Sequence, residues 1–269
     1  MNYFQTALLE VSMLGVLSAI AGTLIILRKR SFFAVALSHA TFPGGVLFAV
    51  LGFNVLIGQA IFAVLLVFAM TLLARVPGQG KQVSSGVVLA FGFAFGLLLS
   101  GLSEGNPVPV EALLVGSPLS VSTGDVTATA VVLAISVGAI VLMRRRVLFH
   151  TFDPVGFESS GFRVWPVELV STAVIAAAVV VAMPAVGAIL GVALIIAPAA
   201  AARNLATRIE WVPALAAVIG VASGALGLWL SREFDLAAGG AIGLVTTLVF
   251  VLSLFVNRAP FVRRKVSVA

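Results

Sequence analysis

Among the residues within the long apolar stretches of the sequence, His39 is the clearest candidate for metal chemistry. It lies in an apolar run at about residues 32–53, and its neighbours include Ser38, Thr41 and Pro43. An ionisable side chain inside a bilayer is costly, which makes it a candidate for a functional site. A neutral imidazole binds zinc, manganese or iron well. Two interpretations stay open from the residues alone: a metal-pathway residue, or a histidine hydrogen-bonded to a backbone carbonyl inside a helix bundle.

Two glutamates also lie in apolar runs. Glu10 either lines a pathway or extends its carboxylate to the outer interface, and Glu168 is expected to extend to the cytoplasmic interface. His150 is expected on the cytoplasmic side, so it cannot share a ligand sphere with His39 of the same chain. The sequence shows no Ser/His/Asp arrangement, no intramembrane carboxylate pair and no phosphate-binding glycine loop. We therefore predict that this chain is not an enzyme and has no ATP site of its own.

The overall composition explains where these side chains must sit. The chain has 269 residues, of which 61% are hydrophobic and 10% are charged, and its mean hydropathy is +1.20. Soluble domains carry about 25% charged residues, so a soluble enzyme, a disordered protein and a nucleic-acid-binding protein are excluded. The absence of cysteine excludes a disulfide framework and a thiolate metal site.

Nine apolar runs are long enough, at roughly 20 residues, to cross a bilayer. They lie at about residues 4–27, 32–53, 55–74, 84–102, 124–143, 165–183, 186–202, 211–230 and 237–256. We therefore predict an all-α polytopic membrane protein with about nine transmembrane helices. Counts from eight to ten stay open. Residues 1–269 form a single transmembrane domain in this interpretation. The stretch 108–123 remains open between a loop and a re-entrant segment.

The distribution of charge predicts the topology. Lysine and arginine gather in short cytoplasmic loops of membrane proteins. With nine spans and the N-terminus outside, 15 of the 16 Lys and Arg residues face the cytoplasm, and only Arg232 does not. The opposite face collects the acidic residues Glu104, Glu111, Asp125, Glu233 and Asp235. The C-terminus is then cytoplasmic, and the net charge of +6 needs no nucleic-acid partner.

The segment 147–164 is the most polar part of the chain between two runs. Asp153 precedes Pro154, a pair that favours a helix start in which the aspartate is the N-cap. Gly161 is expected to end that helix about two turns later. Phe152 and Phe157 are placed to anchor the short helix or to dock a partner. The segment is thus either an amphipathic connector or a docking element for a soluble partner.

Four motifs in the same order resemble the metal-type (zinc, manganese or iron) ABC importer permeases. They are a basic turn at 28–33 followed by the histidine segment 36–44, Phe152-Asp153-Pro154 with Gly161, a late helix at 186–203, and a last hairpin at 227–239. The resemblance covers about residues 10–256. The family usually has an aspartate four residues before the histidine, where this chain has Val35.

The resemblance implies a permease subunit of an ATP-driven importer of divalent transition metals in a bacterial cytoplasmic membrane. It implies a pair of permease chains, expected to be a homodimer, with separate ATPase subunits and an extracytoplasmic solute-binding protein. His39 is implied on the metal pathway, with Glu10 as a candidate carboxylate. The alternatives are an ABC permease for metal chelates such as siderophores, or a secondary transporter working alone.

The resemblance also implies where the partners bind. The ATPase binds the coupling segment through Phe152, Asp153, Pro154, Phe157 and Gly161. The acidic outer face, with Glu104, Glu111, Glu233 and Asp235, is expected to receive the solute-binding protein. The metal is cargo, ATP belongs to the partner, and no cofactor is expected on this chain.

Overall fold

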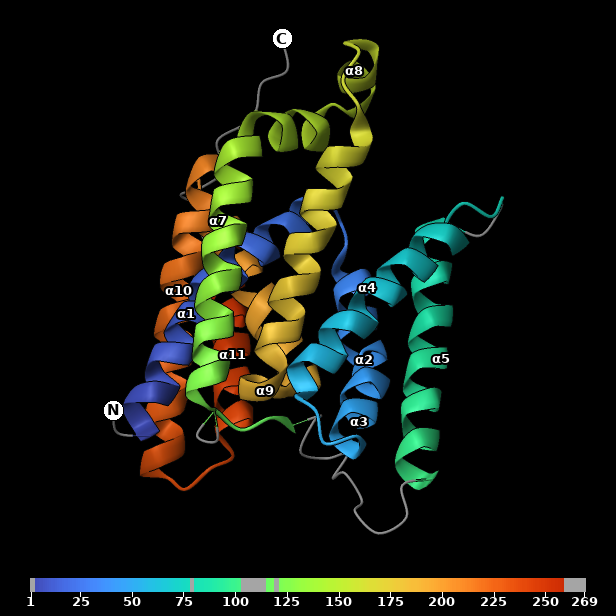
Figure 1. Ribbon diagram of the computed structural model, residues 1–269. Coiled ribbons are helices and arrows are strands. Elements are labelled where there is room, and N and C mark those ends of the chain that lie inside the picture. Colours follow the sequence, from blue (N-terminus) through green and yellow to red (C-terminus); the bar gives the residue numbers. More distant parts are fainter. Residues whose placement is uncertain (1–2, 78–79, 103–114, 119–120, 259–269) are drawn as a thin grey trace.

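The computed structural model describes residues 3–77, 80–102, 115–118 and 121–258, and within these ranges the regular structure is helical (Figure 1). The helices are α1 (Tyr3–Leu27), α2 (Ser31–Ala40), α3 (Phe42–Val50), α4 (Val55–Leu73), α5 (Gly80–Leu102), α7 (Thr123–Phe152), α8 (Pro154–Ser159), α9 (Val164–Leu205), the short 3₁₀ helix η2 (Ile209–Trp211), α10 (Val212–Glu233) and α11 (Ala238–Arg258).

The helices confirm the predicted class, an all-α polytopic membrane protein. Eight helices of the described chain are long and apolar enough to cross a membrane, and a ninth apolar helix, Leu190–Leu205, is shorter. The second predicted run is one span made of two helices, because α2 ends and α3 begins at Thr41. Pro43 lies in the first turn of α3, where a missing N–H costs no helical hydrogen bond.

One predicted boundary differs from the structure. The fifth predicted run ends at residue 143, before three arginines, but α7 continues to Phe152. Charge ends an apolar run without ending a helix, since arginine is a good helix former. The stretch 108–123 lies mostly outside the described residues.

Helix α9 changes direction at Gly187. This residue has φ 81° and ψ 167°, a conformation that side chains with a Cβ rarely adopt. The kink separates the apolar segment Val164–Ala188 from the segment Leu190–Leu205. The predicted division between the sixth and seventh runs therefore falls within a few residues of the observed kink.

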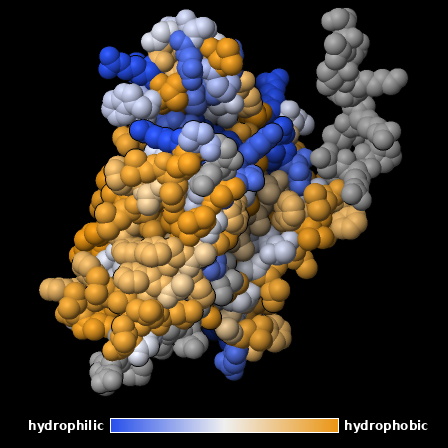
Figure 2. Space-filling model, turned by 90° about the vertical axis from the view of Figure 1, so that its right-hand side faces the viewer, coloured by the Kyte–Doolittle hydropathy of each residue, from blue (hydrophilic) through white to orange (hydrophobic). Residues whose placement is uncertain are grey.

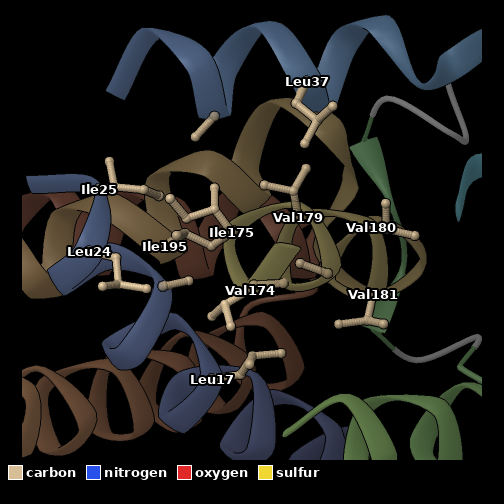
Figure 3. Close-up of a cluster of buried hydrophobic side chains, with 14 of the residues drawn as sticks. Leu17, Leu24, Ile25, Leu37, Val174, Ile175, Val179, Val180, Val181 and Ile195 are labelled. Atoms are coloured by element: carbon tan, nitrogen blue, oxygen red, sulfur yellow. The ribbon is translucent and has the colours of Figure 1, made fainter. Parts of the chain in front are cut away.

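The core forms where α1 and α9 meet. Leu24 and Ile25 of α1 lie close to Ile175 and Ile195 of α9 in the cluster that Figure 3 shows. Close helix approach depends on small residues: a Cβ on Gly15 would lie 2.7 Å from the backbone nitrogen of Val221 on α10. Small residues let transmembrane helices pack closely without a hydrophobic driving force.

The outer surface is apolar over most of its height. Figure 2 shows a broad hydrophobic band, with hydrophilic residues gathered at the end that carries α8. Large side chains on this surface include Val64, Phe91, Ile135 and Leu244, each more than 60% exposed. Such a surface is stable against lipid chains rather than water, and the protein is a multi-pass membrane protein.

Candidate metal pathway and coupling elements

His39 lies near the end of α2, with one ring nitrogen held by its own helix. Its Nδ1 is 3.0 Å from the carbonyl oxygen of Val35 and 3.1 Å from Oγ of Ser38. A carbonyl oxygen only accepts hydrogen bonds, so Nδ1 donates and carries the proton. In the neutral ring, Nε2 then keeps its lone pair, as in metal sites where a carbonyl orients a histidine ligand. Val35, where the family usually has aspartate, contributes its backbone instead of a carboxylate.

The His39 ring faces α5 across a hollow of about 440 Å³. The α5 side of this hollow is apolar and is formed by Gly86, Leu89, Ala90, Phe93, Ala94 and Leu97. The Phe93 ring meets the imidazole edge-on, with 6.4 Å between ring centres. The hollow therefore gives access to the imidazole, but the α5 residues that form its walls supply no strong metal ligand.

The described part of the chain does not provide a complete ligand set for a metal ion. Among the described residues, no group of three or more His, Asp or Glu side chains is placed to hold a metal ion. A metal ion at His39 would thus have one imidazole from this chain, with further ligands from water or from another chain.

Glu10 occupies a different place in the bundle. Its side chain is fully buried in α1, and Thr129 of α7 donates a hydrogen bond of 2.7 Å to Oε1. Its Oε2 has no hydrogen-bond partner within the described part of the chain. Helix α7 packs against α1, whereas the His39 ring faces α5. The structure therefore joins Glu10 to Thr129 and does not bring it to His39.

Helix α8 has the local structure that the sequence predicts. Asp153 is the N-cap, and its Oδ1 accepts a 2.8 Å hydrogen bond from the backbone N–H of Gly156. Pro154 is the first helical residue. Gly161 follows the helix with φ +78°, the left-handed conformation of a glycine C-terminal stop.

Aromatic packing fixes α8 to the end of α7. Phe157 is fully buried, and its ring centre lies 5.4 Å from that of Phe149 and 5.2 Å from that of His150. Phe152 is 58% exposed and Val155 of α8 is 80% exposed. Of the two phenylalanines singled out in the sequence, Phe157 anchors the helix within this chain and Phe152 remains on the surface.

A charged cluster beside α8 is absent from the sequence analysis. Glu168 of α9 pairs with Arg28 at 3.1 Å and also with Arg30, whose Nη1 donates to Thr172 at 2.8 Å. A further contact of 2.7 Å joins Arg28 to Nδ1 of His150. The carboxylate of Glu168 is therefore held by two arginines of the α1–α2 turn, and its expected position at the cytoplasmic interface stays a prediction.

Burial shapes the electrostatics of this cluster. The Arg28 side chain is only 5% exposed, and burial lowers the pKa of its guanidinium while the Glu168 carboxylate raises it. The ion pair offsets the desolvation of both partners. About 140 residues separate Arg28 from Glu168 in sequence, and no spacing rule links positions so far apart.

The acidic residues of the other face are only partly described. Glu104 and Glu111 lie outside the described residues. Glu233 ends α10 and Asp235 follows it, and both are exposed. The neighbouring Arg232 places its guanidinium 4.9 Å from the ring centre of Phe4 in α1. These carboxylates therefore lie at the end of the bundle where α1 begins, opposite α8 (Figure 1).

The described chain is a bundle of membrane-spanning helices with a short capped helix, α8, at one end. The sequence model of the ABC 3 transport family matches residues 1–257. The chain belongs to this family.

Known relatives resemble the chain along nearly its whole length. It is 31% identical over 254 residues to the manganese transport system membrane protein MntC of Halalkalibacterium halodurans, covering 94% of this chain and 87% of the relative. It is similar to the structure of PsaBC from Streptococcus pneumoniae in complex with Fab, with a TM-score of 0.85 and 28% identity over 95% of this chain and 92% of that one.

A more distant structure shares the fold alone. An inward-facing metal-chelate type ABC transporter, described as putative, has a TM-score of 0.75 and 14% identity, covering 93% of this chain and 85% of that one.

Proposed function

We propose that this chain is the transmembrane subunit of an ATP-driven importer of divalent transition metal ions, with manganese as the first candidate cargo. The observation that carries the proposal is the orientation of His39, whose Nδ1 is held by the Val35 carbonyl so that Nε2 is left to bind metal. Membership of the family, and a relative named for manganese transport, agree with this chemistry.

Two copies of the chain complete the pathway in this proposal. One imidazole is a weak site for a divalent cation, and a second His39 from a partner copy supplies a second nitrogen ligand. A site with few protein ligands suits a transport pathway, since an ion must bind well enough to enter and weakly enough to leave. Glu10 is a second pathway candidate, although its observed partner is Thr129.

The two ends of the bundle receive different partners. The ATPase docks on α8 and the adjoining end of α7, where Val155 and Phe152 are exposed. The solute-binding protein docks on the opposite end, where Glu233 and Asp235 favour a basic partner surface and speed its approach. Manganese is transferred from that protein to the His39 pathway.

The charged cluster supplies a physical link between these events. Phe157 packs α8 against His150, His150 contacts Arg28, and Glu168 joins Arg28 to Arg30. Arg30 immediately precedes α2, the helix that carries His39. Motion of α8 on ATP binding is thereby transmitted to the metal-pathway helix.

The test is metal uptake by vesicles that contain the permease, its ATPase and the binding protein. His39→Gln keeps a hydrogen-bonding side chain but is a poor metal ligand. We expect His39→Gln to abolish manganese uptake while the subunits still assemble. The control is Glu210→Gln, which alters an exposed carboxylate on η2 outside the proposed pathway and coupling elements and should leave manganese uptake unchanged. Normal uptake by His39→Gln would show that His39 is a packing residue, as a chelate permease would predict.

A further inference from the structure

A second cavity, of about 1440 Å³, lies between α4 and α9 and is separate from the His39 hollow. Along α4 it is lined by Leu56, Ala60 and Val67, and along α9 by Leu169, Ala176 and Val180. Their spacings of four and seven residues place each set on one helix face. Figure 1 shows α4 and α9 diverging toward the end that carries α8.

Positive charge is confined to one end of this groove. Lys29, Arg75 and Lys81 line it near the end of the bundle that carries α8. Arg28 and Arg30 also line it, but Glu168 neutralises part of their charge. Within the described residues, Lys29, Arg75 and Lys81 take part in neither of the two salt bridges. Glu158 also lines the groove, so its five lysine and arginine side chains face two carboxylates, and an excess of positive charge remains for an anionic group.

The apolar part of the groove is long. Leu56 lies 17 residues before Leu73, the last residue of α4, a separation of about 25 Å at the helical rise per residue, and Arg75 follows just beyond the helix end. The occupant must therefore be an extended apolar molecule with negative charge at one end. A metal ion does not fit, because the basic end repels cations and the walls between Leu56 and Val67 carry no ligand.

We propose that this groove binds one anionic phospholipid from the leaflet on the α8 side of the membrane. Its phosphate lies against Arg75, Lys81 and Lys29, and an acyl chain extends between α4 and α9. Basic pockets between transmembrane helices are a recurring means of holding anionic lipid headgroups. A helix from a second copy of the chain would fill the apolar part but would leave the three cations without a counter-charge.

The test uses the full chain purified in mild detergent and examined by native mass spectrometry, with phosphatidylglycerol or phosphatidylcholine added. We expect one phosphatidylglycerol to remain bound under conditions that remove phosphatidylcholine. Replacing two cations in Arg75→Gln/Lys81→Gln should weaken this binding roughly 30-fold, at about 1 kcal/mol for each cation. The matched control Arg144→Gln/Arg145→Gln removes two exposed cations that do not line the groove, and it should bind normally.

A second variant tests the apolar part. Ala173 lies in the groove on α9 and is exposed, so Ala173→Trp should fill the groove and displace the lipid while every cation remains. Equal phosphatidylglycerol retention by the Arg75/Lys81 and Arg144/Arg145 variants would overturn the proposal. So would a shift of Ala173→Trp from dimer to monomer with lipid retention unchanged, since a second copy would then occupy the groove.

Discussion

At the scale of single residues, the pathway histidine depends on what stands four positions before it. Residues four apart lie on the same face of a helix, and Val35 uses its backbone oxygen to orient His39. An aspartate at that position would add an anionic ligand beside the imidazole. In the proposed pathway, His39 would supply one imidazole ligand per chain, which would favour fast release over tight binding.

This difference gives a residue-scale prediction. Val35→Asp should lower the manganese concentration for half-maximal uptake about tenfold, equivalent to about 1.4 kcal/mol, and should also lower the maximal rate because release becomes slower. Uptake measured against manganese concentration checks both effects. Val35→Asn introduces a side chain of similar shape to aspartate but without its charge, so its uptake should match that of the unmodified permease. An unchanged concentration dependence in Val35→Asp would place the metal elsewhere.

The buried hydrogen bond between Thr129 and Glu10 gives a second prediction at this scale. Thr129→Val removes the hydroxyl that donates to Oε1 and leaves both carboxylate oxygens buried without a described partner. The expected loss is about 1–3 kcal/mol of stability, measured as a lower unfolding temperature in detergent. Glu10→Gln keeps an acceptor for Thr129 and should be affected less. Equal stability of Thr129→Val and the parent would contradict the importance of this contact.

At the scale of elements, the α8 region is a short helix held by the two long helices on either side of it. His150 lies in the last turn of α7, and Glu168 lies in the first turns of α9. Both reach the arginines of the α1–α2 turn. In the proposed mechanism, these contacts carry force from α8 to α2.

The link predicts a separation of ATP hydrolysis from transport. Glu168→Gln removes the charge that joins Arg28 and Arg30, at a cost of about 1.5–3 kcal/mol for charged hydrogen bonds. We expect ATP hydrolysis to continue while manganese uptake per ATP falls. The control Glu210→Gln alters an exposed carboxylate on η2 and should leave this ratio unchanged. An unaltered ratio in Glu168→Gln would exclude the cluster as the link.

The stop of α8 makes a related prediction. Gly161 has φ +78°, whereas proline requires φ near about −65°, so Gly161→Pro should disorder the end of α8 and reduce uptake without preventing membrane insertion. Gly161→Asn is the matched control, since asparagine tolerates the left-handed conformation. Transport at the normal rate by Gly161→Pro would refute a docking role for α8.

At the scale of the whole molecule, the local features were predictable and the long-range contacts were not. The apolar runs and the Asp153-Pro154 helix start depend on neighbouring residues, so the sequence predicts α1, α4 and α8 almost to the residue. The Glu10–Thr129 contact joins positions 119 residues apart. The burial of Phe157 also depends on packing with residues that flank α8 on both sides, which no local pattern specifies.

The topology remains a prediction at this scale. The chain has no cysteine, so a single introduced cysteine reports one position cleanly. Phe234→Cys, next to the α10 end, should react with an impermeant thiol reagent in intact cells. Ser159→Cys in α8 should react only after permeabilisation. Labelling of both from the same side would contradict the predicted orientation.

The most direct measurement of the central claim is ATP hydrolysis coupled to manganese uptake. It requires the permease reconstituted in vesicles with its ATPase and solute-binding protein. We predict that manganese-loaded binding protein stimulates hydrolysis and drives uptake, and that His39→Gln removes the uptake. Manganese uptake by the permease alone, driven by an ion gradient and without ATP, would contradict the account.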